Sequence, residues 1–514
     1  MQQDFFGRWG DKSSKRIIKR TYRGGMINEA QITIRNAGLL LTQRGFHILG
    51  SLLFAVLVPR LMGPNDYGRY ALITSLSFWF MMFSDLGFTQ IMGRYTPLFM
   101  LQGEKEKLQK FFTNLLTVSL VSGALVGCLY LLFTSLCLPD IDLVLFITMA
   151  ATIVVRAAVH PFFTLFLGLN QAARWGMGEI FRHGFIIVSV IIGFYLRGLQ
   201  GACLGLFLTE LIVLSIGIGW GKSYFSWKDL RLDFPSLIPS LRFGLMFFVF
   251  NLLTSTFQHS GEILVRFFYP DYVQVAYFGL AYDVSQRVSA FIPQLTLAFA
   301  PFMVTLLAQG ETKALKQWIE QLINWLTVGG VFVFFGVLLL GNDLVPLVLG
   351  AAYQPVATNL LPLSMVLWVQ ALSNAAILLT LVYNRPKIAI VAAGVRLVAM
   401  LVFGPLLIAR WGSWGGCLAV LAASLIFAGY LTWRMQGIVT YSLQKWALAI
   451  ALGLPFLSLL WWQSSWIVNV GLYSIFLIGY CTLLLLLRFI KPSEMVAVWR
   501  AFRSKTEMMN WSKS

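Results

Sequence analysis

The feature that most constrains this chain is a series of long apolar runs that recurs from near residue 36 to near residue 488. Most runs are about 20 residues long, the helix length that crosses a bilayer core of about 30 Å. They are too long and too uniformly apolar for barrel strands of about 10 alternating residues, so helices are the only plausible spanning structure. We therefore predict an all-α polytopic membrane protein with about 14 transmembrane helices. The fourteen predicted spans lie near 36–58, 70–92, 112–134, 143–167, 173–196, 201–220, 243–267, 274–299, 318–340, 360–382, 387–408, 413–433, 446–463 and 468–488.

The composition excludes the soluble classes of protein. Hydrophobic residues make up 58% of the 514 residues and charged residues 12%, whereas a soluble protein carries about 25% charged residues. Soluble cytosolic enzymes, secreted disulfide scaffolds and soluble nucleic-acid binders are excluded, and we expect no nucleic acid partner. The five cysteines show no metal-binding spacing, so we expect no metal site, no disulfide framework and no bound cofactor.

The distribution of basic residues predicts the orientation in the membrane. The net charge is +18, and in a membrane protein such an excess is first interpreted as the positive-inside bias of cytoplasmic loops. If the N-terminus is cytoplasmic, most basic loop residues fall on that side, so we predict that both termini face the cytoplasm. The N-terminal segment lacks the pattern of a signal peptide, and we expect the first span to stay as an anchor. The basic residues predicted for loops on the opposite side are Arg60, Arg69, Arg197, Arg266 and Arg410.

An internal repeat relates two halves of the chain. Several short matches share one offset of 214 residues, which is stronger evidence of duplication than any one match alone. The matches predict two pseudo-symmetric six-helix lobes in the same orientation, related by an axis along the membrane normal. The matched pairs are residues 198–204 with 412–418, Asn170 with Asn384, Arg182 with Arg396 and, approximately, Gly68 with Gly279.

This repeat and the loop lengths predict the domain organisation. Two similar lobes that face each other suit alternating access, in which a site between them opens to one side and then to the other. The loops are short, so the sequence offers no extramembrane domain for a nucleotide or sugar-nucleotide site. The predicted parts are a basic cytoplasmic segment (1–35), an N-lobe (36–220), a cytoplasmic linker (221–242), a C-lobe (243–434), and two extra C-terminal spans with a cytoplasmic tail (435–514).

The strongest functional signal is a set of ionisable side chains inside the predicted spans. A charge at the bilayer centre costs about 2.5–3.5 kcal/mol on the lenient insertion scale, so such residues should face protein or a wet cavity rather than lipid. The set comprises Arg44, His47, Asp85, Arg156, His160, Arg182, Glu210, His259, Glu262, Asp283, Arg287 and Arg396.

Two interpretations of this set stay open. In the first, the charges neutralise one another and fix helix packing: Asp283 pairs with Arg287 four residues later, and Asp85 pairs with Arg44. In the second, arginines line a central cavity for an anion, because the guanidinium fork binds phosphate bidentately and stays charged when desolvated. The predicted cavity residues are Arg44, Arg287, Arg156, Arg396, Arg182 and His47. The candidates for ion pairs or for coupling to H⁺ or Na⁺ are Asp85, Glu262 and Asp283.

Short motifs resemble those of a known family. Residues 61–72 (LMGPNDYGRYAL) resemble the LGPxxYGxYAL segment of bacterial polysaccharide-biosynthesis transporters. These are the O-antigen and exopolysaccharide flippases of the multidrug/oligosaccharidyl-lipid/polysaccharide exporter superfamily. Residues 85–88 (DLGF) resemble their DLGF turn, and residues 277–282 (YFGLAY) resemble their second-half GxY segment.

The resemblance implies a fold and a function. It implies two six-helix lobes in a V, often with two extra helices, that flip an undecaprenyl-diphosphate-linked oligosaccharide from the cytoplasmic to the outer leaflet of the bacterial inner membrane. The related lipid II flippases place cavity arginines on the first and eighth spans, where Arg44 and Arg287 lie here. The implied partners are the lipid-linked oligosaccharide, membrane lipid, a polysaccharide polymerase and glycosyltransferases. No catalytic residue is expected, because no bond is made.

Two other functions compete with this one. A cation-coupled drug or metabolite antiporter of the same superfamily would depend on Glu262, Asp283 or Asp85, but such antiporters commonly have twelve spans. A membrane-bound polymerase or glycosyltransferase needs a sizeable non-cytoplasmic loop or a sugar-nucleotide domain, and the sequence shows neither. We therefore predict a transporter and not an enzyme.

Overall fold

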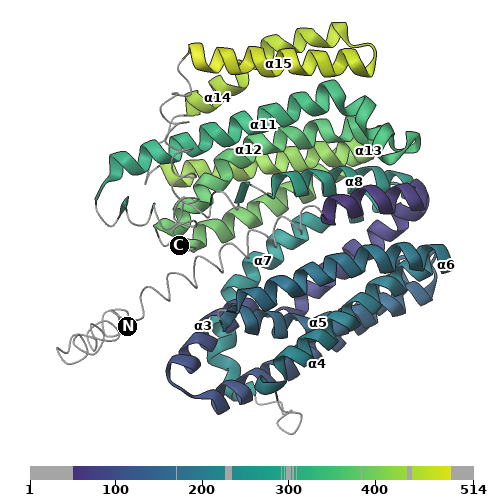
Figure 1. Cartoon of the computed structure of the whole chain (residues 1–514), viewed down its shortest axis with the longest axis vertical. Coiled ribbons are helices and arrows are strands. Elements are labelled where there is room, and N and C mark those ends of the chain that lie inside the picture. The colour runs from purple at the N-terminus through teal and green to yellow at the C-terminus, as the bar shows by residue number, and fades with distance from the viewer. Residues whose placement is uncertain are drawn as a thin grey trace, which may run out of the picture. The chain divides into compact units, whose positions relative to one another are not determined.

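The computed structural model describes residues 50–169, 171–225, 234–290, 292–293, 296, 303, 306–307, 310–383, 385–436 and 443–487. These residues are almost entirely helical and include no strand (Figure 1). Eight of their helices are long and apolar enough to cross a membrane, and the number rises to ten if each of two bent helix pairs counts as one span. The predicted all-α polytopic fold is confirmed.

Two of the eight helices are too long for a single crossing. Helix α6 (Ala172–Gly221) has 50 residues and α13 (Pro386–Gln436) has 51. A straight helix of that length would measure about 75 Å, more than twice the bilayer core of about 30 Å. Both contain a non-helical break, at Gly198 and at Gly412 respectively. Each long helix therefore holds two of the spans that the sequence predicts.

The chain folds back on itself at each break. In α6 the backbone of Gly193 lies directly against Gly201, and in α13 the backbone of Leu407 lies directly against Gly415. In both cases the contacting residues flank the break, as they do in a helical hairpin. The two contacts are again 214 residues apart in the sequence, so the duplicated halves form the same hairpin.

The breaks themselves have the same backbone conformation. Gly198 has φ 57° and ψ −139°, and Gly412 has φ 56° and ψ −134°. These angles are close to those of the first central residue of a type II′ turn, a position that glycine dominates because a Cβ atom would clash there. The predicted internal repeat is confirmed in these helices, whereas its Asn170 and Asn384 pair lies outside the described residues.

The described residues divide into two compact units. Unit 1 comprises the described residues within 50–54 and 80–248, and unit 2 comprises those within 55–79 and 249–487. Within unit 1, α5 packs against α3, α4 and α6, and a cluster of buried phenylalanines that includes Phe112 and Phe162 fills the space between them. The described elements of unit 1 are α3 (Phe88–Leu101), α4 (Lys105–Cys137), α5 (Leu143–Gly168), α6, the 3-10 turn η1 (Lys222–Tyr224) and the first part of α7 (Phe234–Phe268).

Helical structure extends beyond the predicted ends of the first two spans. One helical segment runs from Gly50 to Ser84 and covers the predicted loop between residues 58 and 70, with a left-handed residue at Gly63 (φ 74°). Helix α3 then continues to Leu101, bent by 42° from the preceding segment. Hydropathy reports only the apolar length that crosses a bilayer, so it does not detect helix that continues at the membrane surface.

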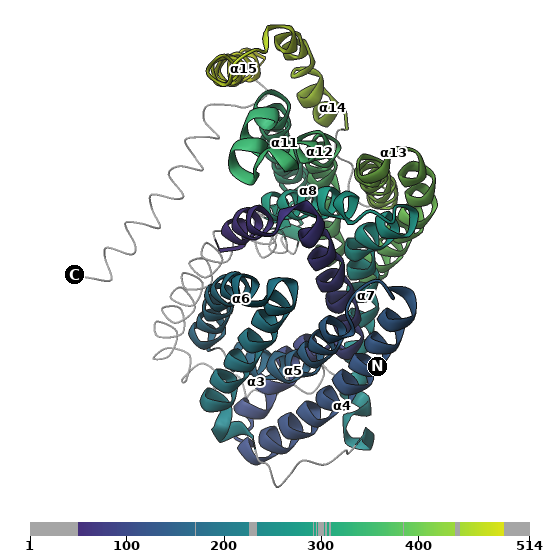
Figure 2. The same ribbon diagram turned by 90° about the vertical axis from the view of Figure 1, so that its right-hand side faces the viewer.

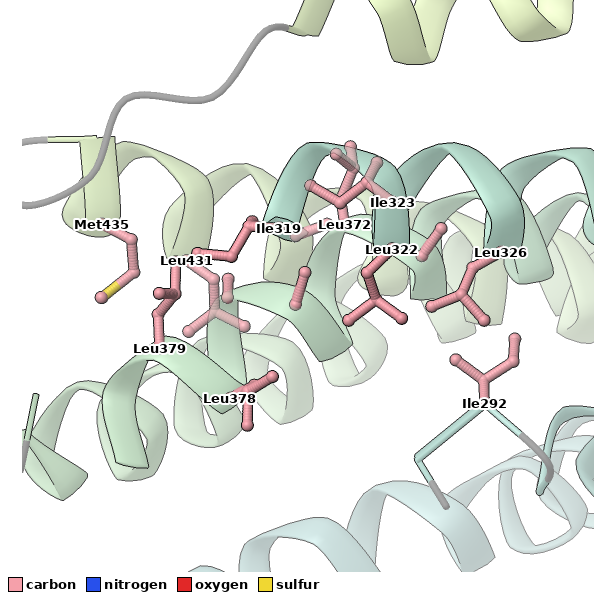
Figure 3. Packing of buried hydrophobic residues seen from close by; sticks show 14 of the residues in the cluster. Ile292, Ile319, Leu322, Ile323, Leu326, Leu372, Leu378, Leu379, Leu431 and Met435 are labelled. Atoms are coloured by element: carbon pink, nitrogen blue, oxygen red, sulfur yellow. The ribbon is translucent and has the colours of Figure 1, made fainter. Parts of the chain in front are cut away.

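Unit 2 is built around α12. This helix packs against α8, α11 and α13, and leucines and isoleucines such as Ile323, Leu326 and Leu372 form the apolar cluster drawn in Figure 3. The described elements of unit 2 are the remainder of α7, α8 (Tyr272–Ser289), α11 (Thr312–Leu349), η3 (Ala351–Tyr353), α12 (Pro355–Val382), α13, α14 (Leu443–Ala451), η4 (Leu454–Trp462) and α15 (Trp466–Leu486).

The last two spans pack on the outside of α11 (Figure 2). The ring of Phe335 stacks on that of Phe476 with 4.1 Å between centroids. The Asn469 amide donates a hydrogen bond of 2.6 Å to Asp343. Among the described elements, α14, η4 and α15 lie on one side of unit 2, against α11. They are therefore an addition to the repeat, as the sequence predicts.

The hairpin at Gly198 can be tested without disturbing any neighbour. Nothing lies within 4 Å of a Cβ atom built on Gly198 or on Gly219, and both glycines belong to α6. Gly198→Ala should destabilise the protein by about 1–3 kcal/mol, because alanine is strained at this φ. The matched control, Gly219→Ala, should not destabilise it, because alanine favours helix by about 1 kcal/mol over glycine. Thermal unfolding in detergent measures the stability of both variants. Equal melting temperatures would contradict the left-handed turn conformation at Gly198.

Candidate functional site

Unit 1 holds an ion-pair network between α5 and α6. The guanidinium of Arg156 donates to a carboxylate oxygen of Glu210 at 2.5 Å. Arg182 donates to Glu179 at 2.6 Å and lies 3.5 Å from Glu210. Arg182 and Glu210 are 7% and 5% exposed. Two arginines and two glutamates thus compensate one another inside the unit, and the role of Arg156 and Arg182 as cavity residues stays a prediction.

Two members of this network were missed by the sequence reasoning. Glu179 lies three residues before Arg182 on the same helix, and His183 lies 3.9 Å from the Glu179 carboxylate. The spacing of Glu179 and Arg182 is a recognisable helix-pair signal. The contact of Glu210 with both arginines joins residues from different helical segments, and nothing in the local sequence indicates it.

Asp85 lies at the bend between the Gly50–Ser84 segment and α3. Its carboxylate accepts a hydrogen bond of 3.1 Å from the Phe88 backbone N–H, and it lies 3.8 Å from the ring of His160. Asp85 therefore stabilises the first turn of α3. The predicted pair of Asp85 with Arg44 and the predicted cavity residue His47 lie outside the described residues, because the description begins at residue 50.

In unit 2, α8 carries the ion pair that its spacing predicts. Arg287 donates to Asp283 at 3.2 Å, and the two residues are four apart. The Asp283 side chain is 45% exposed, so its carboxylate is only partly desolvated. The pair is consistent with the helix-packing interpretation, and its partial exposure also leaves it accessible to a ligand.

Glu262 on α7 is a buried carboxylate with incomplete hydrogen bonding. It is 6% exposed, and its Oε2 atom has no hydrogen-bond partner within the part of the chain that the structure describes. Its side chain packs beside Gly279 of α8, and its charge interacts with that of Asp283. Ser75 and His259 hydrogen-bond to each other at 2.8 Å in the same unit. A proton or a cation at Glu262 would satisfy the unpartnered oxygen.

Arg396 on α13 is a cation of unit 2 for which the described residues supply no carboxylate partner. Its Nη2 atom donates to the Ser424 hydroxyl at 3.0 Å, and its guanidinium lies 3.8 Å from the centre of the Phe257 ring and 5.1 Å from that of Phe427. Its Nε atom is buried without a hydrogen-bond partner, and it forms no ion pair with any acid in the described ranges. Ring contacts contribute about 0.5–2 kcal/mol, less than the several kcal/mol that desolvating an ion costs.

Repeated helical lobes with ionisable side chains inside their spans define the class of protein, a polytopic membrane transporter. A sequence profile described as polysaccharide biosynthesis protein matches residues 33–307, more than half of the chain. The chain belongs to this family. Among the described residues no group of three or more His, Cys, Asp or Glu side chains is placed to hold a metal ion.

The fold is similar to those of known transporters. The lipid II flippase MurJ in an inward closed conformation aligns with a TM-score of 0.61 and 14% identity, covering 88% of this chain and 100% of that chain. An inward-facing multidrug resistance MATE family transporter of the MOP superfamily aligns with a TM-score of 0.59 and 17% identity, covering 77% and 94%. The eukaryotic MATE transporter AtDTX14 aligns with a TM-score of 0.56 and 15% identity, covering 82% and 98%. A comparison with curated proteins gave no match.

These similarities show a shared fold and not a shared substrate, because the identities are low. The similar structures named above are those of a flippase and of transporters rather than of enzymes.

The ion-pair network of unit 1 predicts a large loss of stability when its shared acid is removed. Glu210→Ala removes this partner from the buried Arg182 and from Arg156, whose side chain is 30% exposed, and breaking a buried pair costs about 3–5 kcal/mol. Glu104→Ala is the matched control: its partner Lys107 is 67% exposed, and exposed pairs contribute about 0–1 kcal/mol. The yield and melting temperature of the purified protein measure the difference. If the Glu210→Ala protein has the same melting temperature as the control, the network does not stabilise unit 1.

Proposed function

We propose that this protein flips an undecaprenyl-diphosphate-linked oligosaccharide from the cytoplasmic to the outer leaflet of the bacterial inner membrane, in O-antigen or exopolysaccharide biosynthesis. Membership of the polysaccharide biosynthesis protein family supports a role in polysaccharide biosynthesis. The fold shared with a lipid II flippase supports a lipid-linked substrate. The observation that carries the proposal is the charged interior of unit 2, where Arg287 and Arg396 lie on helices of the membrane domain.

The proposed mechanism makes no covalent bond. Guanidinium groups replace water around the diphosphate as it leaves the cytoplasmic surface, because arginine stays charged when desolvated and binds phosphate oxygens in pairs. The polyprenyl tail remains in lipid. Alternating access then exposes the headgroup on the other side, and the substrate drives this change only as far as its affinities for the two states differ. Both termini face the cytoplasm in this proposal.

Two further elements belong to the same proposal. Glycosyltransferases supply the lipid-linked oligosaccharide on the cytoplasmic side, and a polymerase consumes it on the outer side. Transport is coupled to H⁺ or Na⁺ through Glu262 and Asp283, with Asp85 as a further candidate. The support for coupling is the buried Glu262 carboxylate, whose Oε2 atom lacks a partner among the residues described, and its interaction with Asp283. Carboxylates held inside a membrane domain commonly mark ion or proton pathways.

A cation-coupled drug or metabolite antiporter is the second candidate. The fold shared with MATE transporters and the position of Glu262 inside unit 2 favour it. The two C-terminal spans, Leu443–Trp462 and Trp466–Leu486, count against it, because such antiporters commonly have twelve spans. In this case overexpression should confer drug resistance that depends on Glu262, Asp283 or Asp85.

The flippase proposal predicts that two arginine substitutions abolish polymer export. Arg44→Ala and Arg287→Ala each remove a guanidinium group expected to bind the diphosphate, and Asp283 is exposed enough to tolerate the loss of its partner. Surface polysaccharide is measured in a strain that lacks its own flippase and expresses each variant. Immunoblots should show wild-type amounts of protein.

The matched control for this experiment is Lys107→Ala, which removes an exposed cation paired with Glu104 and should leave export unchanged. Full export by both arginine variants would contradict the proposal. Drug resistance without restoration of polysaccharide would instead favour the antiporter.

A further inference from the structure

The two halves can be compared residue by residue around Arg182 and Arg396. Helices α6 and α13 begin 214 residues apart, at Ala172 and Pro386, and their breaks are separated by the same number. Helices α5 and α12, which precede them, end at Gly168 and Val382, again at this offset. The structure therefore fixes the register of the duplication in this region, independently of the short sequence matches.

In this register one cation is retained and its counter-ions are lost. Arg182 corresponds to Arg396. The two glutamates that compensate Arg182 in unit 1 correspond to residues without charge in unit 2. The pairs at this offset are Glu179 with Ala393, Glu210 with Ser424, and Arg156 with Gln370.

The geometry around the two arginines agrees with this register. Arg182 lies 3.5 Å from the Glu210 carboxylate, and Arg396 donates to the hydroxyl of Ser424, the residue in the equivalent place, at 3.0 Å. The contact between the equivalent positions is thus present in both units, and only the contact in unit 1 is between charged groups. Ala393 and Ser424 are also shorter than the glutamates they replace.

The surroundings of Arg396 leave its charge unbalanced. Phe257 on α7 and Phe427 on α13 cover the guanidinium, and Tyr282 on α8 is a titratable side chain in its electrostatic surroundings. Glu262 and Asp283 interact with Tyr282 as well, but neither forms an ion pair with Arg396 in the described part of unit 2. The residue as a whole is half-buried.

We propose that Arg396 takes its counter-ion from the ligand: a phosphate group binds in unit 2 where the carboxylates of Glu179 and Glu210 lie in unit 1. The ligand class is a diphosphate ester, whose negative oxygens replace two acidic side chains. This inference rests on the proposed function, because that function makes the diphosphate of the lipid carrier the anion that enters the protein. It also assigns different roles to the two equivalent arginines: Arg182 stabilises unit 1, and Arg396 binds substrate.

Restoring the lost counter-ion tests this directly. Ser424→Glu recreates the arrangement of Arg182 and Glu210, and Ala393→Glu recreates that of Arg182 and Glu179 three residues away. Each variant should weaken the binding of inorganic pyrophosphate to the purified protein, measured by titration calorimetry, by about tenfold or more. Because Ala393 and Ser424 are 4% and 2% exposed, the melting temperature of each variant is measured as well, and a variant that melts with the wild type reports binding without a folding defect. Arg396→Ala should weaken binding equally.

The control variant is Ser424→Gln, which adds the same bulk without charge and should keep pyrophosphate binding within about twofold of wild type. Equal loss in the glutamine and glutamate variants would show that bulk alone blocks the site and would overturn the inference. Wild-type affinity in Ser424→Glu, Ala393→Glu and Arg396→Ala would overturn it as well. Two glutamate variants are used so that poor folding of one leaves the other informative.

Competition distinguishes the possible sources of the phosphate. Polyprenyl diphosphate in micelles should displace pyrophosphate from the wild-type protein at lower concentration than phosphatidylglycerol in the same micelles. Equal displacement would mean that Arg396 binds an ordinary lipid headgroup, and it would overturn the assignment to the carrier lipid.

Calorimetry measures binding without transport. Unchanged binding in the variants would therefore refute the site and leave the proposed function standing, whereas binding through Arg396 without any flipping would refute the function alone.

Discussion

The compensation of charge inside a bilayer is the constraint on which this structure depends. An ion without a partner is costly in a low-dielectric interior, whereas a well-paired ion is tolerated. Unit 1 meets the constraint internally, because Arg156 and Arg182 both contact Glu210. Unit 2 meets it only in part, since Arg287 pairs with Asp283 while Arg396 has aromatic rings and a hydroxyl as its neighbours. That difference is the basis of our proposal that unit 2 binds an anion.

Duplication explains how the difference arose within one fold. The hairpins at Gly198 and Gly412 share their backbone angles, so the two halves present equivalent positions on equivalent helices. In such a repeat the same contact can differ in charge between the copies, as it does for Arg182 with Glu210 and Arg396 with Ser424. The addition of α14, η4 and α15 to unit 2 alone shows that the halves also diverged on their outer surface.

Much of the fold could be predicted from the sequence, and less of the site. The apolar runs give the spans because crossing a bilayer requires a fixed helix length, and the Asp283–Arg287 pair follows from spacing along one helix. The contact of Arg396 with Phe257 could not be predicted, because it joins α13 to α7 across many residues of chain. The bend before α3 and the helical segment through Gly63 were also missed, since hydropathy does not report chain direction. Arg44 and His47 lie outside the described residues, so their role stays a prediction.

The most direct test of the account is a flipping measurement with purified protein in vesicles. A fluorescent undecaprenyl-diphosphate oligosaccharide is placed in one leaflet, and a membrane-impermeant reagent reports its arrival in the other. We predict that vesicles containing the wild-type protein move the lipid faster than protein-free vesicles do. Equal rates in the two preparations, with the protein shown to be folded, would contradict the central claim.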